Sequence, residues 1–306
     1  MLQASFKVVV VLRGWVQVES NSFTINTFGG LSLAKSSGLF APKLGRTSCE
    51  IFTFLAMQNG KPVGRDKLAE RFWPSQSSKK SRSALNTSIW RLSQAIASWD
   101  IEKLISLERT DETLRLDITN VKEALDCQNL VTCVKQIEFN DNDAVLSNSQ
   151  KINALEKALE RYTDSFLPTH ESDWVMQERE RLRCLYIRGC QIMMRHCVNI
   201  RCFERALSYG RKIMAQDDLR ENTLRQIIWL HVMNGERHIA IQKYLSFQLK
   251  LREELSVDVM PDTLSLYESI VDNSLVPSEQ GASMPLNTPD HLEQLAAYRC
   301  SIFERL

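Results

Sequence analysis

Residues 79–98 read KKSRSALNTSIWRLSQAIAS, and this stretch decides the fold of the N-terminal third of the chain. Leu85, Ile89, Leu92 and Ile96 recur at helical spacing, within about 40° of one another at 100° per residue. They form one apolar stripe, so we expect a helix that packs this side against neighbouring helices. The opposite side of the same helix is polar and basic.

The flank of this helix contains no acidic residue. Between Glu70 and Asp100 there is no Asp or Glu, while five basic residues occur: Arg71, Lys79, Lys80, Arg82 and Arg91. A helix with one apolar side and an acid-free basic side is typical of a domain that binds a polyanion. Double-stranded DNA is therefore the first partner that the sequence predicts. A solvated surface helix is the alternative, and the missing acids argue against it.

Most of the residues that we expect to face DNA lie opposite the stripe, with Asn86 on the shoulder and Arg82 nearer the stripe, and one lies at the tip of a hairpin that follows. They are Lys79, Lys80, Arg82, Ser83, Asn86, Thr87, Trp90, Arg91 and Arg109. The two lysines at the helix start suit phosphate contacts, because the helix N-terminal amides also point there.

Arg82, Trp90, Arg91 and Arg109 each have two candidate roles. Asn86 can bond adenine through both amide atoms, and Arg91 can bond guanine or a phosphate. Trp90 could touch a thymine methyl group or a sugar, or pack against the hairpin. Arg82 lies nearer the apolar stripe and could be structural. Arg109 would reach a phosphate or the minor groove.

The elements around the basic helix are expected in the order of a winged helix. Residues 23–36 predict two short strands around Gly29-Gly30, and a helix capped by Thr47 or Ser48 would end at Asn59-Gly60. A second helix over 65–72 would stop at Trp73-Pro74. After the basic helix, 104–107 and 114–118 predict a hairpin with a polar tip.

From residue 119 the pattern changes to helices only, expected at 121–136, 150–163, 174–198, 202–215, 219–233, 236–255 and 262–272. Ala206-Leu207 recurs as Ala240-Ile241, and Arg201 as Gly235, both 34 residues apart. This period is typical of tetratricopeptide helix pairs, which stack and share one core. The fold class is therefore mainly α, a winged helix followed by a tetratricopeptide-like helical domain.

Composition sets further limits on function. The first 118 residues hold 16 Lys or Arg against 10 Asp or Glu, while the remainder is acidic. No apolar run is long enough to span a membrane, and Val8–Leu12 is better interpreted as a strand than as a signal sequence, so we expect a cytoplasmic protein. The cysteines and histidines lack metal-ligand spacing, so neither a metal nor a cofactor is expected. No GxSxG, HExxH or GxGxxG motif occurs, and we do not expect an enzyme.

Four segments resemble the SARP-type transcriptional activators, named for the Streptomyces antibiotic regulatory proteins. They are INTFGGLSL (25–33), GRTSCEIFTFLAMQNGKPVGRDKLAERFWP (45–74), SRSALNTSIWRLSQAI (81–96) and LREELSVDVMPDTLSLYESI (251–270). The resemblance implies a DNA-binding winged helix before a bacterial transcriptional activation domain. It places residues 79–91 in the major groove and Arg109 on the wing.

The sequence departs from the family pattern at Trp90 and Ser93, where small or basic residues are usual, so the base preference is not carried over. The P-loop of the larger relatives is missing. We expect an extension with a strand over 1–22, the winged helix over 23–118, the activation domain over 119–273, and a linker with a short helix (His291–Arg305) over 274–306.

The leading hypothesis is a sequence-specific activator that binds promoter DNA through the winged helix. Its helical domain would mediate self-association on DNA, recruitment of RNA polymerase, or both. A protein-interaction scaffold that uses the tetratricopeptide-like groove, with incidental DNA binding, is the alternative. Redox or ligand sensing by the stretch from Cys184 to Cys202 is a third. Against that third hypothesis, we expect the cysteines of this stretch to be buried as small apolar residues.

Overall fold

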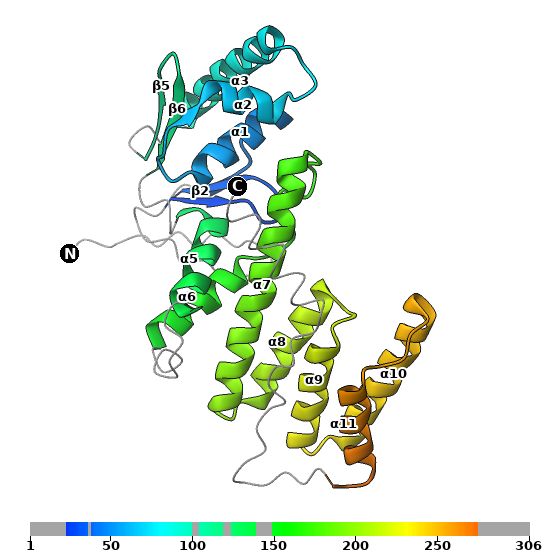
Figure 1. Ribbon diagram of the computed structural model, residues 1–306. Helices are drawn as coiled ribbons and strands as arrows, with labels where there is room; N and C mark the ends of the chain where they lie inside the picture. The colour runs from blue at the N-terminus through cyan, green and yellow to red at the C-terminus, as the bar shows by residue number, and fades with distance from the viewer. Residues whose placement is uncertain (1–22, 36–37, 100–103, 119–123, 139–148, 275–306) are drawn as a thin grey trace, which may run out of the picture. The chain divides into compact units, whose positions relative to one another are not determined.

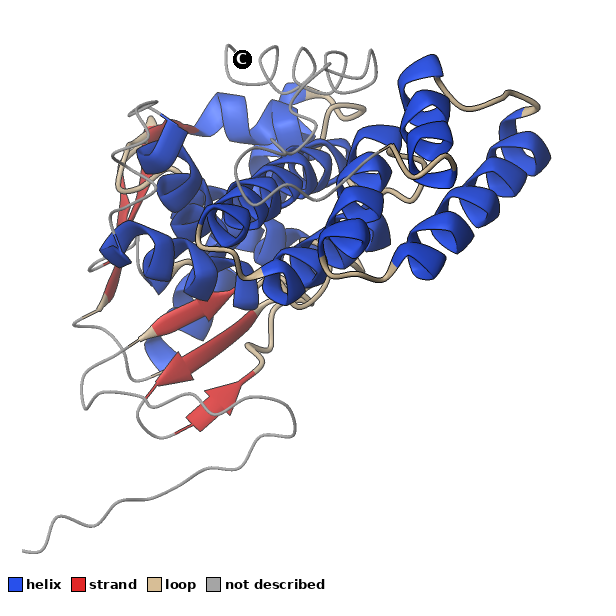
Figure 2. Cartoon of the chain, turned by 90° about the horizontal axis from the view of Figure 1, so that it is seen from below, coloured by secondary structure: helices blue, strands red, loops and turns tan. Residues whose placement is uncertain are grey.

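The computed structural model describes residues 23–35, 38–99, 104–118, 124–138 and 149–274 (Figure 1). Helices make up most of this part of the chain, and the strands are short (Figure 2). The prediction of a mainly α fold, with a winged helix before tetratricopeptide-like helices, is confirmed. The strand expected within 1–22 and the terminal helix at 291–305 lie outside the described residues.

The first sheet contains the predicted pair of strands and one more. β1 (Thr24–Asn26), β2 (Ser32–Lys35) and β3 (Gly38–Phe40) are antiparallel, and fully buried Ile25 lies opposite fully buried Leu33. Gly29 has φ 79° and Gly30 has φ 115° in the turn between β1 and β2. Glycine adopts these values at little cost, which explains the Gly-Gly pair. β3 was not predicted.

Three helices and a second sheet complete the winged helix. α1 (Arg46–Met57), α2 (Arg65–Phe72) and α3 (Ser78–Ser98) precede the hairpin of β5 (Ile105–Arg109) and β6 (Thr113–Ile118), and β4 (Val63–Gly64) pairs with β6. α1 ends as predicted, with φ 53° at Asn59. Its predicted cap is wrong: Gly45 precedes the helix without a side-chain bond, and Ser48 is buried inside it.

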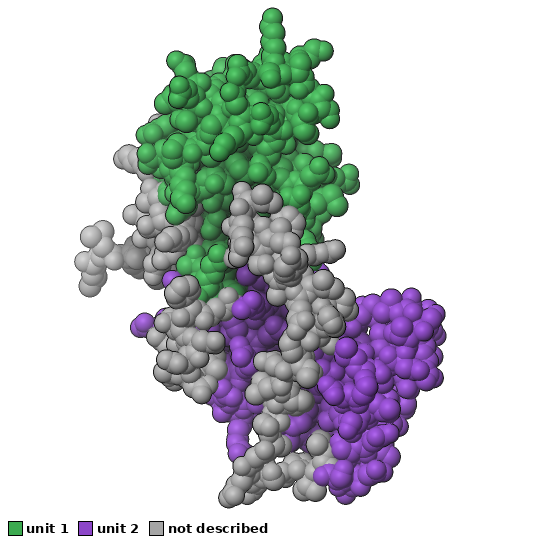
Figure 3. All heavy atoms as spheres, viewed as in Figure 1, with its two compact units in different colours: residues 1–135, 160–182 green, residues 136–159, 183–306 purple. Residues whose placement is uncertain are grey.

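The chain forms two compact units (Figure 3). The first contains residues 1–135 and 160–182, and the second contains 136–159 and 183–306. The division falls within α5 (Asp126–Glu138), α6 (Ser149–Glu160) and α7 (Asp173–Asn199). The predicted domain boundary after residue 118 stays a prediction.

In the first unit, a buried carboxylate joins the β1–β2 turn to the start of α5. Asp126 is 1% exposed and accepts four hydrogen bonds. They come from the Thr27 amide (2.7 Å), the Thr27 hydroxyl (2.6 Å), the Phe28 amide (3.0 Å) and the Cys127 amide (2.7 Å). A buried carboxylate is tolerated because both of its oxygens are satisfied.

A second buried carboxylate joins α1 to the start of α7. Glu50 is 5% exposed and accepts from the Ser172 hydroxyl at 2.8 Å and the Trp174 indole at 3.3 Å. The Trp174 ring also lies edge-on against Phe54 and Phe72, with ring centroids 5.6 and 5.9 Å away. These contacts make residues 160–182 part of the unit that carries the winged helix.

The second unit contains α8 (Phe203–Gln216), α9 (Glu221–Met233), α10 (Arg237–Leu255) and α11 (Pro261–Val271). α9 packs against α8, α10 and α11 (Figure 1). Gly210 permits close approach, because a Cβ there would lie 2.8 Å from Ile227 Cγ1. Leu224, Ile228, Tyr244 and Phe247 belong to the shared core.

The 34-residue repeat is visible in the backbone of this unit. Arg201 and Gly235 both have positive φ, 56° and 76°. The amide of the residue after each one bonds the carbonyl five residues earlier, at 2.8 Å in both turns. This is the hydrogen bond of a Schellman helix end. Ala206 and Ala240, five residues after each turn residue, are fully buried.

The cysteines of α7 and its end are buried to different degrees. Cys190 and Cys197 are buried, while Cys184 and Cys202 are partly exposed. Burial raises the pKa of the Cys190 thiol to about 12 and that of Cys197 to about 11. The expectation of burial holds for these two residues, which would react slowly as thiols.

Replacing Asp126 with Asn tests the junction between the β1–β2 turn and α5. The variant turns one carboxylate oxygen into an amide donor that faces backbone N–H groups, so we expect it to lower the free energy of unfolding by about 2–4 kcal/mol. Urea denaturation measures this change. Asp111→Asn, at an exposed position, is the control and should change it by less than about 0.5 kcal/mol. Equal stability of the two variants would contradict the account.

Candidate nucleic-acid interface

Helix α3 is oriented by its apolar stripe. Leu85, Ile89, Leu92 and Ile96 are 1%, 3%, 0% and 6% exposed, as the spacing predicts. α3 packs this side against α1 and α2. Because the stripe is buried, the opposite side of the helix must face outward.

The residues of α3 predicted to bind DNA are brought together on its exposed surface. Lys79, Lys80, Arg82, Ser83, Asn86, Thr87, Trp90 and Arg91 are all exposed. Within the described ranges, no ion pair is made by Lys79, Lys80 or Arg91. The Thr87 hydroxyl donates to the Ser83 carbonyl at 3.1 Å, so its oxygen is left as an acceptor. Trp90 is 60% exposed, which argues against packing on the hairpin.

Arg82 differs from the other cations because it has a partner on α2. Its Nε and Nη2 donate to the two oxygens of Asp66 at 2.7 and 2.8 Å. The Arg82 guanidinium holds the pKa of the Asp66 carboxyl below its usual range. This two-point geometry is strong for an ion pair, although solvent screens it. Arg82 thus has a structural partner, and its charge is offset in the free protein.

Asn86 also has a partner on α2, which the sequence did not reveal. Arg65 Nη2 donates to Asn86 Oδ1, and Arg65 Nη1 donates to the Thr110 carbonyl at 3.1 Å. Arg65 therefore links α3 to the hairpin. Arg65 and Asp66 stand side by side with opposite charges, but their partners lie 21 and 16 residues later. No local spacing rule predicts such pairs.

The hairpin tip carries charges of both signs. Arg109 is exposed at the end of β5, opposite Leu114 of β6. The turn is held by Thr110, whose hydroxyl oxygen accepts from the Thr113 amide at 2.9 Å. Asp111 and Glu112 are exposed beside it. Their negative charge opposes a phosphate near Arg109, so the hairpin should attract DNA less than α3 does.

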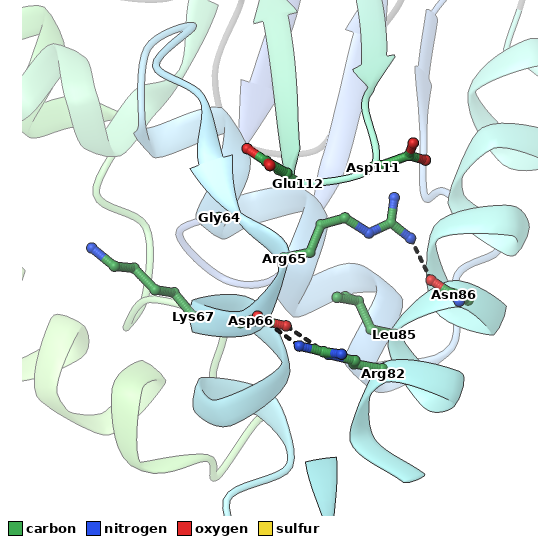
Figure 4. Close-up of a pocket in the computed structure, with 9 residues that line it drawn as sticks. All are labelled: Gly64, Arg65, Asp66, Lys67, Arg82, Leu85, Asn86, Asp111 and Glu112. Atoms are coloured by element: carbon green, nitrogen blue, oxygen red, sulfur yellow. Dashed lines mark hydrogen bonds and ion pairs between the residues drawn. The ribbon is translucent and has the colours of Figure 1, made fainter. Parts of the chain in front are cut away.

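These elements surround an open pocket of about 760 Å³ between α2, α3 and the hairpin. Figure 4 shows the Arg65 guanidinium reaching across it toward Asn86, and Arg82 lying against Asp66. The carboxylates of Asp111 and Glu112 stand on its hairpin side (Figure 4). Among the residues that the structure describes, no cluster of His, Cys, Asp or Glu is suited to hold a metal ion.

Comparison with known proteins finds one family that the helical part of the chain resembles. Residues 125–271 match the family described as "Bacterial transcriptional activator domain". The predicted resemblance to SARP-type transcriptional activators is confirmed for this segment, which is similar to that family. No curated protein matches the sequence significantly.

A solved structure has a similar fold. It is Mycobacterium tuberculosis EmbR in complex with a low-affinity phosphopeptide, with a TM-score of 0.64 and 15% sequence identity. The match covers 92% of this chain and 71% of that chain. At this identity the likeness concerns the fold. In the described part of the chain, no helix has the length and apolar character needed to cross a membrane.

Two substitutions on α3 test which side of the helix is buried. Leu92→Ala should lower the free energy of unfolding by about 2–5 kcal/mol, because it leaves a cavity in the core. Trp90→Ala should change it by less than about 0.5 kcal/mol, because the ring is mostly exposed. Chemical denaturation measures both values. A large loss in Trp90→Ala would show that the exposed side has been assigned wrongly.

Proposed function

We propose that the protein is a sequence-specific transcriptional activator that binds promoter DNA through α3 and the β5–β6 hairpin. The observation that carries the proposal is the exposed side of α3, where Lys79, Lys80 and Arg91 stand free of ion pairs within the described ranges. An uncompensated basic side attracts the phosphate backbone, and the rigid helix between the cations can present side chains to base edges.

The roles within this surface differ by residue. Lys79 and Lys80 contact phosphate and supply affinity that is independent of sequence. Asn86, Thr87, Trp90 and Arg91 lie further along the helix and read bases. Arg109 contacts a phosphate or the minor groove, with its effect reduced by the adjacent acids. Arg82 exchanges Asp66 for a phosphate, or keeps Asp66 and remains structural.

The activator domain over 125–271 supplies the second part of the proposal. It associates with a second copy on DNA, contacts RNA polymerase, or does both, and the protein acts in the cytoplasm as a regulator and not as an enzyme. The match to a transcriptional activator domain supports this role. Stacked helices with one shared core give such a domain a rigid surface for a protein partner.

The salt dependence of DNA binding tests the proposed function. Promoter DNA from upstream of the protein's own gene should bind with an affinity that falls steeply as salt rises, because bound cations release counterions. Lys79→Ala/Lys80→Ala should weaken binding to all sequences and reduce the slope of log K against log salt by about 2. Fluorescence anisotropy over a salt series measures both effects.

The matched control removes the same charge elsewhere. Lys157 and Lys243 are exposed lysines of α6 and α10, so Lys157→Ala/Lys243→Ala should leave the slope unchanged. Equal loss in both double variants would indicate a diffuse charge effect in place of a site on α3. A wild-type protein that binds no promoter DNA would contradict the proposal and favour the scaffold hypothesis.

A further inference from the structure

Arg65 lies between the two elements of the proposed DNA-binding surface. Its guanidinium donates to Asn86 Oδ1 on α3 and to the Thr110 carbonyl of the hairpin. Through these bonds Arg65 affects which base Asn86 can recognise. This inference rests on the proposed function. Arg65 is not among the residues that the sequence predicted to contact DNA.

The backbone of Arg65 is fixed by the hairpin. β4 pairs with β6, with Val63 opposite Leu114 and Gly64 opposite Thr113. The Arg65 amide then donates to the Glu112 carbonyl at 2.8 Å. The side chain therefore starts from an anchored point and reaches Asn86 from the hairpin side (Figure 4).

The chemistry of guanidinium decides how the Asn86 amide is turned. Guanidinium has five N–H donors and no acceptor, so the amide atom that faces it must be the oxygen. Oδ1 is thereby held by a cation, and Nδ2 is the amide atom left to approach a base. The neighbouring residue Asp66 likewise holds Arg82 in place, by accepting hydrogen bonds of 2.7 and 2.8 Å from its guanidinium.

This orientation disfavours the base that Asn would otherwise select. Adenine needs both amide atoms, because its N6–H₂ donates to Oδ1 while its N7 accepts from Nδ2. With Arg65 on Oδ1, the N6–H₂ group would approach an occupied oxygen beside a positive charge. Guanine presents only acceptors, O6 and N7, at the same edge, and these suit the Nδ2–H₂ donor next to a cation.

We propose that Arg65 is a positioning residue that sets base specificity: by holding Asn86 Oδ1, it makes Asn86 a donor that selects guanine over adenine. Arg65 acts through Asn86 and touches no base. Without it, Oδ1 is released and Asn86 gains its usual preference for adenine.

Selection from a 30-base-pair duplex with a randomised core tests this proposal, with sequencing of the bound fraction. The position whose preference is lost in Asn86→Ala is the base that Asn86 reads. Wild-type protein should prefer guanine there. Arg65→Met, which keeps the side-chain length but has no donors, should shift the adenine-to-guanine ratio at that position by about tenfold. Preferences at the other positions should stay the same.

Arg71→Met is the matched control, because it removes one exposed cation from the same helix α2 without touching Asn86. It should leave the guanine preference intact. An unchanged preference in Arg65→Met overturns the proposal. Loss of affinity on all sequences, without a change in preference, also overturns it and makes Arg65 a phosphate contact.

Further outcomes separate this inference from the proposed function. If Arg65→Met does not fold, Arg65→Gln decides: its amide is shorter and uncharged and places no cation on Asn86 Oδ1, so guanine preference should weaken, and full retention overturns the proposal. If wild-type protein binds DNA but Asn86→Ala alters no position, the inference fails and the proposed function stands. If wild-type protein binds no DNA, both fail.

Discussion

Burial of one side of α3 is the constraint on which the rest of the N-terminal unit depends. Leu85, Ile89, Leu92 and Ile96 are almost fully buried. They fix the rotation of the helix about its axis, and large side chains in a close-packed core allow little freedom in that rotation. Every exposed residue of α3, Trp90 included, takes its direction from these four contacts.

Two buried carboxylates extend this rigidity beyond the winged helix. Asp126 binds the β1–β2 turn, and Glu50 of α1 binds Ser172 and Trp174. A buried carboxylate that lost its donors would cost several kcal/mol, so these junctions hold residues 124–135 and 160–182 to the winged helix as one body. The proposed DNA-binding surface therefore belongs to a unit larger than its own helices and hairpin.

Periodic and repeated features were predictable from the sequence, and pairings across distant segments were not. The α3 stripe, the hairpin, the end of α1 at Asn59-Gly60 and the 34-residue repeat all leave local patterns of residue type. The Arg65–Asn86 bond joins residues 21 apart on two helices, and Glu50 meets residues more than 120 positions away. Such contacts depend on tertiary packing, which no spacing rule records. The roles of the individual side chains on DNA stay predictions.

Photo-crosslinking from position 90 shows whether the exposed side of α3 lies against the bases of DNA. A protein with benzoylphenylalanine in place of Trp90 should form a covalent adduct with a promoter duplex on irradiation, because that side chain would face the bases. The same group in place of Met176 is the comparison, since the two residues are 60% and 53% exposed. We expect an adduct from position 90 and none from position 176. No adduct from position 90, or equal adducts from both positions, would contradict it.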